Sequence, residues 1–306
     1  MLASANARGA MFMTVSMAAF SSNDAVSKFV SSSINMGQLM MVRGLFALVL
    51  ILALAYLQGQ LHTPQRLLHR TVGLRVIGEV GATIFFLLAL ANMPLANASA
   101  LFQALPLAVT MGAALFLGEA VGWRRWTAIG VGFLGVLIIL RPGPEGFSTY
   151  SLMVLLAVLF SALRDLSTRL VPAEVSPVLM STLTTVAVTI TGAILVVPLG
   201  GWVEPTPANT APLLVSAVFV LIGYQFVIKA MRVGEISIIS PFRYTNLLFA
   251  VIYGILIFGE LPDIYMIIGG LIVVGSGLYT LYREKKRGAE RPVAESTNPG
   301  MAPDGT

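Results

Sequence analysis

The stretch that decides the fold runs from Pro94 to Glu119 and reads PLANASALFQALPLAVTMGAALFLGE, because its pattern occurs a second time in the chain. Residues Glu235–Glu260 read EISIISPFRYTNLLFAVIYGILIFGE and align with the first stretch without gaps, at an offset of 141 residues. Both copies are long apolar runs that end in Gly-Glu. The sequence therefore contains an internal repeat.

The same offset connects residues near the start of each repeat. Asp24 and Lys28 correspond to Asp165 and Arg169, and the members of each pair are four residues apart. Four residues are about one turn of an α-helix, so each pair predicts an ion pair within one helix, and Arg164 is an alternative partner of Asp165. Each match is weak alone, but together the matches define two related units.

The composition places both units in a membrane. Of the 306 residues 57% are hydrophobic and 11% are charged, with a mean hydropathy of +0.86. A soluble domain has about 45–50% apolar and about 25% charged residues. A membrane-spanning helix needs about 20 mostly apolar residues. Ten apolar stretches can be marked: Ala10–Ser32, Met36–Leu57, Leu74–Leu90, Ala96–Leu117, Trp126–Leu140, Tyr150–Leu170, Val178–Val197, Ala211–Met231, Ile236–Phe258 and Ile264–Tyr282.

These runs predict an all-α integral membrane protein and exclude a soluble enzyme. They also disfavour an outer-membrane barrel, whose strands alternate apolar and polar residues. Because five helices per unit is an odd number, the second unit must enter the membrane upside down. The sequence predicts ten transmembrane helices as two inverted five-helix repeats, residues 10–142 and 150–282, and a disordered cytoplasmic tail at 283–306. Inverted repeats are typical of secondary transporters, with the substrate site between the repeats.

The distribution of charge predicts the orientation. Connections on the side of the two chain ends hold most of the Lys and Arg residues, among them Arg70, Arg124, Arg125, Lys285 and Arg287. The opposite side holds Arg141 with Glu145, Glu204, Glu260 and Asp263. Positively charged loops stay in the cytoplasm. We therefore expect a multi-pass protein with both termini in the cytoplasm.

The two five-helix units, each with Leu/Phe-Gly-Glu at the end of its fourth helix and a glycine-spaced fifth helix, resemble the EamA-type drug/metabolite transporter superfamily. The resemblance covers about residues 10–282 and is greatest to bacterial aromatic amino acid exporters and their broad-specificity relatives. It implies a bacterial inner-membrane exporter of amino acids and similar small metabolites, which works by alternating access.

Polar residues at membrane depth are the candidates for the substrate site, because burying them in lipid is costly. A zwitterionic amino acid needs a donor for its carboxylate, for which Arg43 and Arg243 are candidates. Asn23, Glu79 and Gln103 are candidate acceptors for its ammonium group. The candidate walls of the site come from Phe85, Leu163, Tyr224 and Tyr244. The alternative is that these residues form structural pairs, such as Arg43 with Glu79, or pack a kinked helix.

Asp24 and Glu79 are the candidate coupling residues. Asp24 is expected to pair with Lys28, whereas Glu79 has only Arg75 one turn away and is the better candidate for binding a proton. Glu119 and Glu260 are expected to cap the helices that follow them, where the helix dipole is positive.

Other classes of function find little support in the sequence. Cys is absent, no Gly-x-x-x-x-Gly-Lys-Ser/Thr motif is present, and no His-Glu-x-x-His motif or carboxylate cluster predicts a metal. Neither a cofactor nor nucleic-acid binding is expected, and a membrane enzyme is disfavoured. A passive uniporter or channel and a carrier of another metabolite remain alternatives, with nucleotide sugars ranked lower. Glycines such as Gly130 and Gly275 suit helix packing or a homodimer surface.

Overall fold

The computed structural model describes residues 2–57, 69–119, 121–141, 148–171, 175, 177–233 and 236–287. Within these ranges the secondary structure is helical: α1 (Leu2–Val30), α2 (Met36–Leu57), α3 (Arg70–Leu90), α4 (Leu95–Phe102), α5 (Leu105–Phe116), α6 (Trp123–Leu140), α7 (Thr149–Arg169), α8 (Pro177–Val196), α9 (Pro207–Val233), α10 (Ile236–Ile239), the 3₁₀ helix η1 (Ser240–Tyr244), α11 (Thr245–Phe258) and α12 (Ile264–Arg287). The predicted all-α fold is confirmed.

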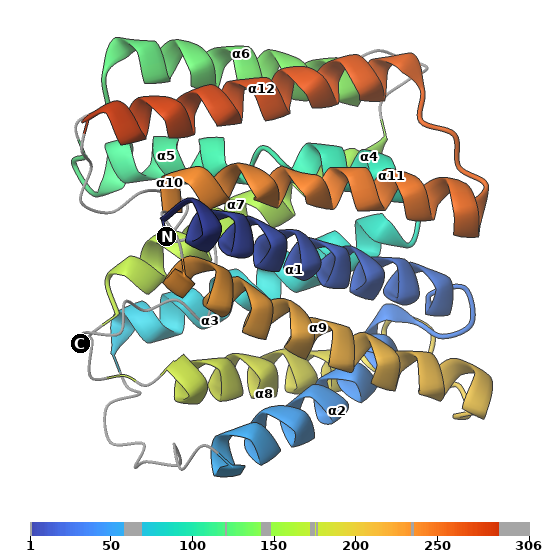
Figure 1. Cartoon of the computed structure of the whole chain (residues 1–306). Coiled ribbons are helices and arrows are strands. Elements are labelled where there is room, and N and C mark those ends of the chain that lie inside the picture. The colour runs from blue at the N-terminus through green and yellow to red at the C-terminus, as the bar shows by residue number, and fades with distance from the viewer. Residues whose placement is uncertain are drawn as a thin grey trace.

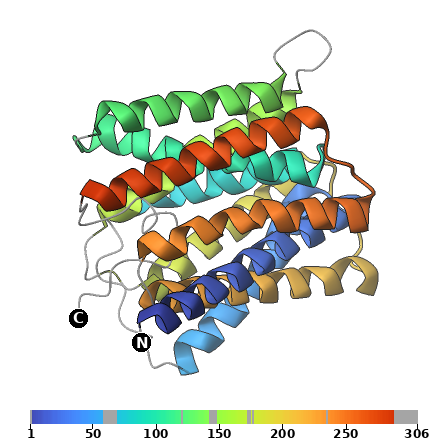
Figure 2. The same cartoon turned by 45° about the horizontal axis from the view of Figure 1, so that its top comes forward.

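The helices pack side by side in one bundle (Figures 1 and 2). Nine segments of the described chain are long and apolar enough to cross a membrane, counting α4 with α5 and η1 with α11 as one segment each. α1 is the tenth long helix of the bundle, and residues such as Ser21, Asn23 and Asp24 make it more polar. Backbone N–H and C=O groups in lipid have no water to bind, and an α-helix pairs them with one another within a single segment.

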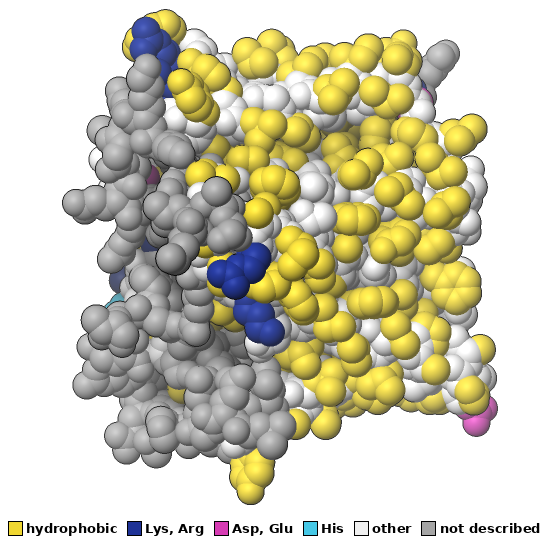
Figure 3. Space-filling view, in the orientation of Figure 1, with side chains coloured by type: hydrophobic (Ala, Val, Ile, Leu, Met, Phe, Trp, Pro, Cys, Tyr) yellow, Lys and Arg dark blue, Asp and Glu magenta, His cyan; other side chains and the backbone are white. Residues whose placement is uncertain are grey.

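The outer surface of the bundle is apolar. Side chains such as Phe116, Leu256 and Leu271 are more than two-thirds exposed, as expected where lipid replaces water. Figure 3 shows hydrophobic side chains over most of the visible face, with Lys and Arg at the end where α1 begins. We call this end, where α1 begins and α12 ends, the terminal end, and the opposite end, where α1 ends, the distal end (Figure 1).

Helix packing follows a pseudo-twofold exchange of the two repeats. At the offset of 141 residues α1, α2, α3, α4–α5 and α6 correspond to α7, α8, α9, η1–α11 and α12. α1 packs against α9, and its counterpart α7 packs against α3. α2 packs against its own counterpart α8, and α6 packs against its own counterpart α12, so an exchange of the repeats leaves these two pairs unchanged. The two five-helix repeats are therefore inverted and interlocked, as the odd helix count predicts.

Two of the predicted spans are interrupted where the repeats meet. The predicted helix Ala96–Leu117 is divided at Gln103-Ala104 into α4 and α5, and the predicted helix Ile236–Phe258 contains η1. Pro106 lies in the first turn of α5 and Pro241 in the first turn of η1. Proline lacks an amide hydrogen, and its ring clashes with the preceding turn, so an α-helix does not run through it undisturbed.

The end of the chain differs from the prediction in one respect. α12 continues as a helix through Arg283–Arg287, where the sequence predicts the start of the tail. Arg, Glu and Lys are good helix formers, and cations are favourable near a helix C-terminus. The remainder of the predicted tail, 288–306, lies outside the described residues.

Candidate functional site

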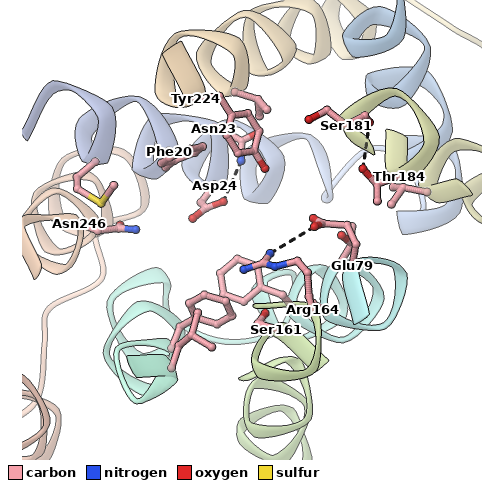
Figure 4. Close-up of a pocket in the computed structure, with 18 of the residues that line it drawn as sticks. Phe20, Asn23, Asp24, Glu79, Ser161, Arg164, Ser181, Thr184, Tyr224 and Asn246 are labelled. Carbon is pink, nitrogen blue, oxygen red and sulfur yellow. Dashed lines mark hydrogen bonds and ion pairs between the residues drawn. The ribbon is translucent and has the colours of Figure 1, made fainter. Parts of the chain in front are cut away.

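A cavity of about 440 Å³ lies inside the bundle and is lined by residues of both repeats. This volume falls in the range of about 300–1,000 Å³ typical of small-molecule sites. α1, α2, α3 and the interrupted α4–α5 contribute from the first repeat, and α7, α8, α9, η1, α11 and α12 from the second. Figure 4 shows Asn23 and Asp24 reaching the cavity from α1, opposite Glu79 of α3 and Arg164 of α7.

The structure brings most of the predicted site residues together around this cavity. The lining includes Asn23, Asp24, Arg43, Glu79, Gln103, Tyr224, Arg243 and Tyr244. Phe85 and Leu163 are not among the lining residues. The Phe85 ring instead stacks on Phe160, with the ring centroids 5.5 Å apart. Neighbouring residues on a helix point in different directions, so Phe86 reaches the cavity although Phe85 does not.

Glu79 has a cationic partner on another helix, which agrees with the alternative of a structural pair, although the partner is Arg164 and not Arg43. Arg164 of α7 places its Nη1 atom 3.4 Å from Glu79 Oε2 and its Nε atom 2.8 Å from Asp165 Oδ1. The close packing of α3 on α7 depends on Gly78, because a Cβ atom there would lie 2.7 Å from the backbone nitrogen of Arg164. Glu79 therefore belongs to a buried charge cluster that joins the repeats.

Asp24 does not pair with Lys28 as predicted. Asn23 Nδ2 donates to Asp24 Oδ1 at 2.9 Å, while Lys28 Nζ forms an ion pair with Glu260 Oε1 at 2.8 Å. Among the described residues Asp24 makes no ion pair, although it lines the cavity. The prediction considered one helix alone, whereas Lys28 lies one turn nearer the distal end, where Glu260 and the Met93 carbonyl group bind it. Asp24 therefore faces the cavity with Asn23 as its hydrogen-bond donor and with no cation in an ion pair, although Arg43 is near enough to interact with it electrostatically.

Arg43 and Arg243 supply positive charge to the cavity wall. Arg43 Nη1 donates to Ser27 Oγ at 3.2 Å and to Asn23 Oδ1 at 3.4 Å, and the alternative pair with Glu79 is not formed. In the described part of the chain Arg243 forms no ion pair, and its Nε atom has no hydrogen-bond partner. Asp165 interacts with Arg243 electrostatically but lies beyond ion-pair distance. A guanidinium at membrane depth that has no carboxylate in direct contact is a candidate for binding an anionic group.

Three more polar side chains of the cavity wall have an atom without a hydrogen-bond partner. Two of them are close to Arg243 in the sequence, and the third lies at the equivalent place in the first repeat. Gln103 Nε2, Tyr244 OH and Asn246 Oδ1 are buried and have no hydrogen-bond partner among the described residues. Gln103 and Tyr244 are equivalent at the offset of 141, and both lie at the helix interruptions. Buried polar atoms are nearly always paired, so unpaired ones that line a cavity indicate groups available to a ligand.

Aromatic rings form an apolar part of the same cavity. Phe20 packs edge-on against Tyr224, with centroids 5.2 Å apart, and Phe86 packs against Phe102 at 5.0 Å. All four residues line the cavity. Aromatic walls bury large areas and suit planar or apolar parts of a ligand.

Several lining residues were not predicted. α8 contributes Ser181, Thr184 and Thr185, whose hydroxyl groups lie on one helix face. The Thr184 hydroxyl donates to Met180 O at 2.9 Å, and the Thr185 hydroxyl donates to Ser181 O at 2.8 Å. Their spacing of three and four residues in an apolar helix was a signal that could have identified this face.

Glu119 and Glu260 do not cap the following helices as predicted. Glu260 Oε2 accepts a hydrogen bond from Leu95 N at 2.8 Å, at the start of α4, and Asp263 Oδ1 instead accepts from Met266 N at 2.7 Å at the start of α12. Glu119 Oε1 accepts from Arg169 Nη1 at 2.6 Å. Both glutamates thus connect helices that are distant in sequence.

Comparison with known proteins agrees with this architecture. The EamA-like transporter family model matches the chain twice, at residues 7–141 and 148–282. The riboflavin transporter of Vibrio cholerae is 30% identical over 94% of this chain and 97% of its own length. The S-adenosylmethionine uptake transporter of Rickettsia prowazekii is 26% identical over 91% of this chain and 94% of its own.

Two further similarities extend the comparison. The pseudopaline exporter of Pseudomonas aeruginosa is 31% identical over 70% of this chain and 75% of its own length. One solved crystal structure matches 94% of this chain and 100% of its own, with a TM-score of 0.65 at 14% identity, and so shares the fold. The chain therefore belongs to the EamA-like transporter family, and the relatives above are named for the transport of small molecules rather than for catalysis.

Proposed function

We propose that this chain exports amino acids and related zwitterionic metabolites across the bacterial inner membrane by alternating access, with both termini in the cytoplasm. The observation that carries the proposal is that one cavity between the repeats contains the Asp24 carboxylate and the Arg243 guanidinium, neither of which forms an ion pair with a described residue. A zwitterion presents the complementary pair of charges. A cavity between inverted repeats is the site at which secondary transporters bind substrate.

In this proposal the two ends of the zwitterion bind at different places in the cavity between the repeats. The substrate carboxylate accepts hydrogen bonds from Arg243, Tyr244 and Gln103, whose donors have no other partners in the described chain. The substrate ammonium group donates to Asp24 of the first repeat. Arg43, held by Asn23 and Ser27, adds positive charge without competing for Asp24 through an ion pair.

The substrate side chain lies against the aromatic part of the cavity. Phe20, Tyr224, Phe86 and Phe102 accept an apolar or ring-shaped group, and such walls discriminate weakly, by about 1–3 kcal/mol per methylene. S-adenosylmethionine and riboflavin, the cargo in the names of two relatives, both contain fused aromatic rings. We therefore infer broad, low-affinity selection that favours aromatic and aliphatic amino acids.

The names of the relatives include both uptake and export, so these names together do not give the direction of transport. The pseudopaline exporter and the resemblance to bacterial amino acid exporters favour export. Asp24 is the coupling residue that we favour over Glu79, because Glu79 already has Arg164 as a partner. One carboxylate that binds either a proton or the substrate ammonium group would couple outward transport to proton entry.

Transport by the purified full chain in proteoliposomes tests the proposal. We expect counterflow of labelled phenylalanine and leucine, competition by S-adenosylmethionine, and faster accumulation when a pH gradient is imposed. The matched control is Glu204→Gln, which alters an exposed carboxylate outside the cavity and should transport normally. Absence of amino acid flux would reject the amino acid assignment, and a flux that ignores the pH gradient would make the protein a uniporter.

A further inference from the structure

Two ion pairs lie at opposite ends of the bundle, outside the proposed substrate site. At the distal end Lys28 Nζ is 2.8 Å from Glu260 Oε1. The same Nζ atom donates to Met93 O at 2.5 Å, and Glu260 Oε2 accepts from Leu95 N at 2.8 Å. These contacts fasten the end of α1 to the connection between α3 and α4 and to the end of α11.

The second ion pair is the repeat-equivalent of the first. Arg169 Nη1 is 2.6 Å from Glu119 Oε1, and it joins the end of α7 to the end of α5 at the terminal end. Lys28 corresponds to Arg169, and Glu119 to Glu260, each at an offset of 141. Each ion pair therefore joins a cation of one repeat to a carboxylate of the other, and an exchange of the repeats converts one pair into the other.

The same backbone turn positions both carboxylates. Gly118 and Gly259 have φ angles of 67° and 65°, in the left-handed region that glycine adopts readily. Directly after them, Glu119 N donates to Ala113 O at 3.2 Å and Glu260 N donates to Gly254 O at 2.9 Å. These helix-ending turns are repeat-equivalent and aim the two side chains back across the bundle.

Burial distinguishes these ion pairs from ordinary surface pairs. The Lys28 and Glu260 side chains are 11% and 21% exposed, and those of Arg169 and Glu119 are 11% and 39% exposed. Exposed ion pairs contribute little, whereas partly buried ones are screened less and cost more to break. Each of the two pairs can therefore bias the closure of its own end.

We propose that Lys28–Glu260 is the latch of the distal end and Arg169–Glu119 the latch of the terminal end. The inference rests on the proposed alternating access, in which the inverted repeats exchange conformations so that one end opens while the other closes. The state open to one end lacks the latch at that end and keeps the other. Removing one latch therefore shifts the population toward the state open at that end.

A single cysteine in the cavity can report which end is open, because the chain has no cysteine of its own. Thr185→Cys places the thiol in the cavity wall. A membrane-impermeant maleimide added to spheroplasts reaches it from the outside, and the same reagent added to inverted vesicles reaches it from the inside. This readout needs no substrate, so a wrong substrate in the proposed function leaves the test of the latches intact.

On this background Glu260→Gln should raise labelling from the distal face about fivefold and lower it from the terminal face, as expected for loss of about 1 kcal/mol. Glu119→Gln should do the reverse. Glutamine keeps the shape of the side chain, and at Glu260 it can still accept from Leu95 N. Lys28→Gln should act in the same direction as Glu260→Gln, and Arg169→Gln in the same direction as Glu119→Gln.

The matched control is Asp263→Asn, which removes a different ion pair at the distal end. Asp263 pairs with Arg141, but the repeat-equivalents of these residues are Gly122 and Tyr282, which carry no charge. This variant should leave labelling from both faces unchanged. Opposite shifts in the two latch variants support the proposal, and their sense also reports which end is periplasmic. Shifts of the same sign, or no shift in either member of a latch, would overturn it.

Discussion

At the scale of single residues, the charged side chains of the cavity fall into two groups: those that form ion pairs within the protein and those that do not. Glu79 and Asp165 share Arg164, so both carboxylates of this cluster have a cationic partner within the protein, although Asp165 Oδ2 has no hydrogen-bond partner among the described residues. Asp24 and Arg243 form no ion pair in the described chain and line the same cavity. Because charge that is only partly compensated in a low-dielectric interior is costly, the residues without an ion pair gain most when a ligand of complementary charge binds.

Arg243→Gln should weaken binding of amino acids by about tenfold or more, since a hydrogen bond to a charged group contributes about 1.5–3 kcal/mol. The measurement is inhibition of counterflow by phenylalanine and by phenethylamine, which lacks the carboxylate. Only phenylalanine should lose affinity. An equal loss for both compounds would mean that Arg243 maintains the shape of the cavity and does not bind the carboxylate.

Asp24→Asn should abolish acceleration by a pH gradient while exchange of internal for external substrate continues at a lower rate. The amide cannot gain or lose a proton, and it offers the substrate ammonium group a weaker acceptor. Glu79→Gln should keep the response to the gradient, because Glu79 serves the Arg164 cluster. Flux measured at matched internal and external pH, and then across a gradient, separates the two variants. A pH response lost only in Glu79→Gln would return the coupling role to Glu79.

At the scale of helices, the site depends on close packing between α3 and α7. A Cβ atom added at Gly78 would lie 2.7 Å from Arg164 N and 2.8 Å from Phe160 O, both backbone atoms that cannot move aside cheaply. Gly78 therefore sets the separation of the helices that carry Glu79 and Arg164. The helix interruptions at Gln103 and η1 act at the same scale, since they turn unpaired donors toward the cavity.

Gly78→Ala should destabilise the protein by about 1–3 kcal/mol, the usual cost of overpacking, and should lower transport. Gly73→Ala on the same helix is its matched control, because a Cβ there meets nothing within 4 Å. Alanine favours the helix more than glycine does, so that variant should be neutral or slightly more stable. Thermal unfolding in detergent measures both. Equal melting temperatures for the two variants would contradict the packing argument.

At the scale of the whole molecule, the inverted repeats place equivalent features at opposite ends. The cations Lys28 and Arg169 occupy the distal and terminal ends, as do their carboxylate partners Glu260 and Glu119. The visible Lys and Arg residues gather toward the terminal end (Figure 3). Under the rule that positive loops stay inside, this arrangement favours a cytoplasmic terminal end.

Single cysteines introduced into this cysteine-free chain test that orientation. Those at Asn92 and Glu204, at the distal end, should react with an impermeant reagent applied to intact cells. Those at His69 and Gly122, at the terminal end, should react only after the membrane is opened. Reaction of Gly122 from outside would contradict the predicted orientation of the first repeat, whatever the substrate.

The sequence alone determined the all-α membrane class, the spans and the inversion of the repeats. The class and the spans follow from hydropathy, which can be read from each segment of the sequence separately. The inversion follows from the odd number of helices in each repeat. Most polar residues predicted for the site do line the cavity, among them Asn23, Arg43 and Gln103, because lipid leaves polar side chains few other places. Whether these residues bind substrate stays a prediction.

Only the tertiary structure decided which charges become partners and which side chains face the cavity. Spacing along one helix favoured Asp24 with Lys28, yet Lys28 pairs with Glu260, 232 residues away in the sequence. Spacing also offered Glu79 only Arg75 within its own helix, whereas α7 supplies Arg164. A salt bridge depends on distances of a few ångströms between helices, and those distances follow from packing, which no local pattern in the sequence encodes.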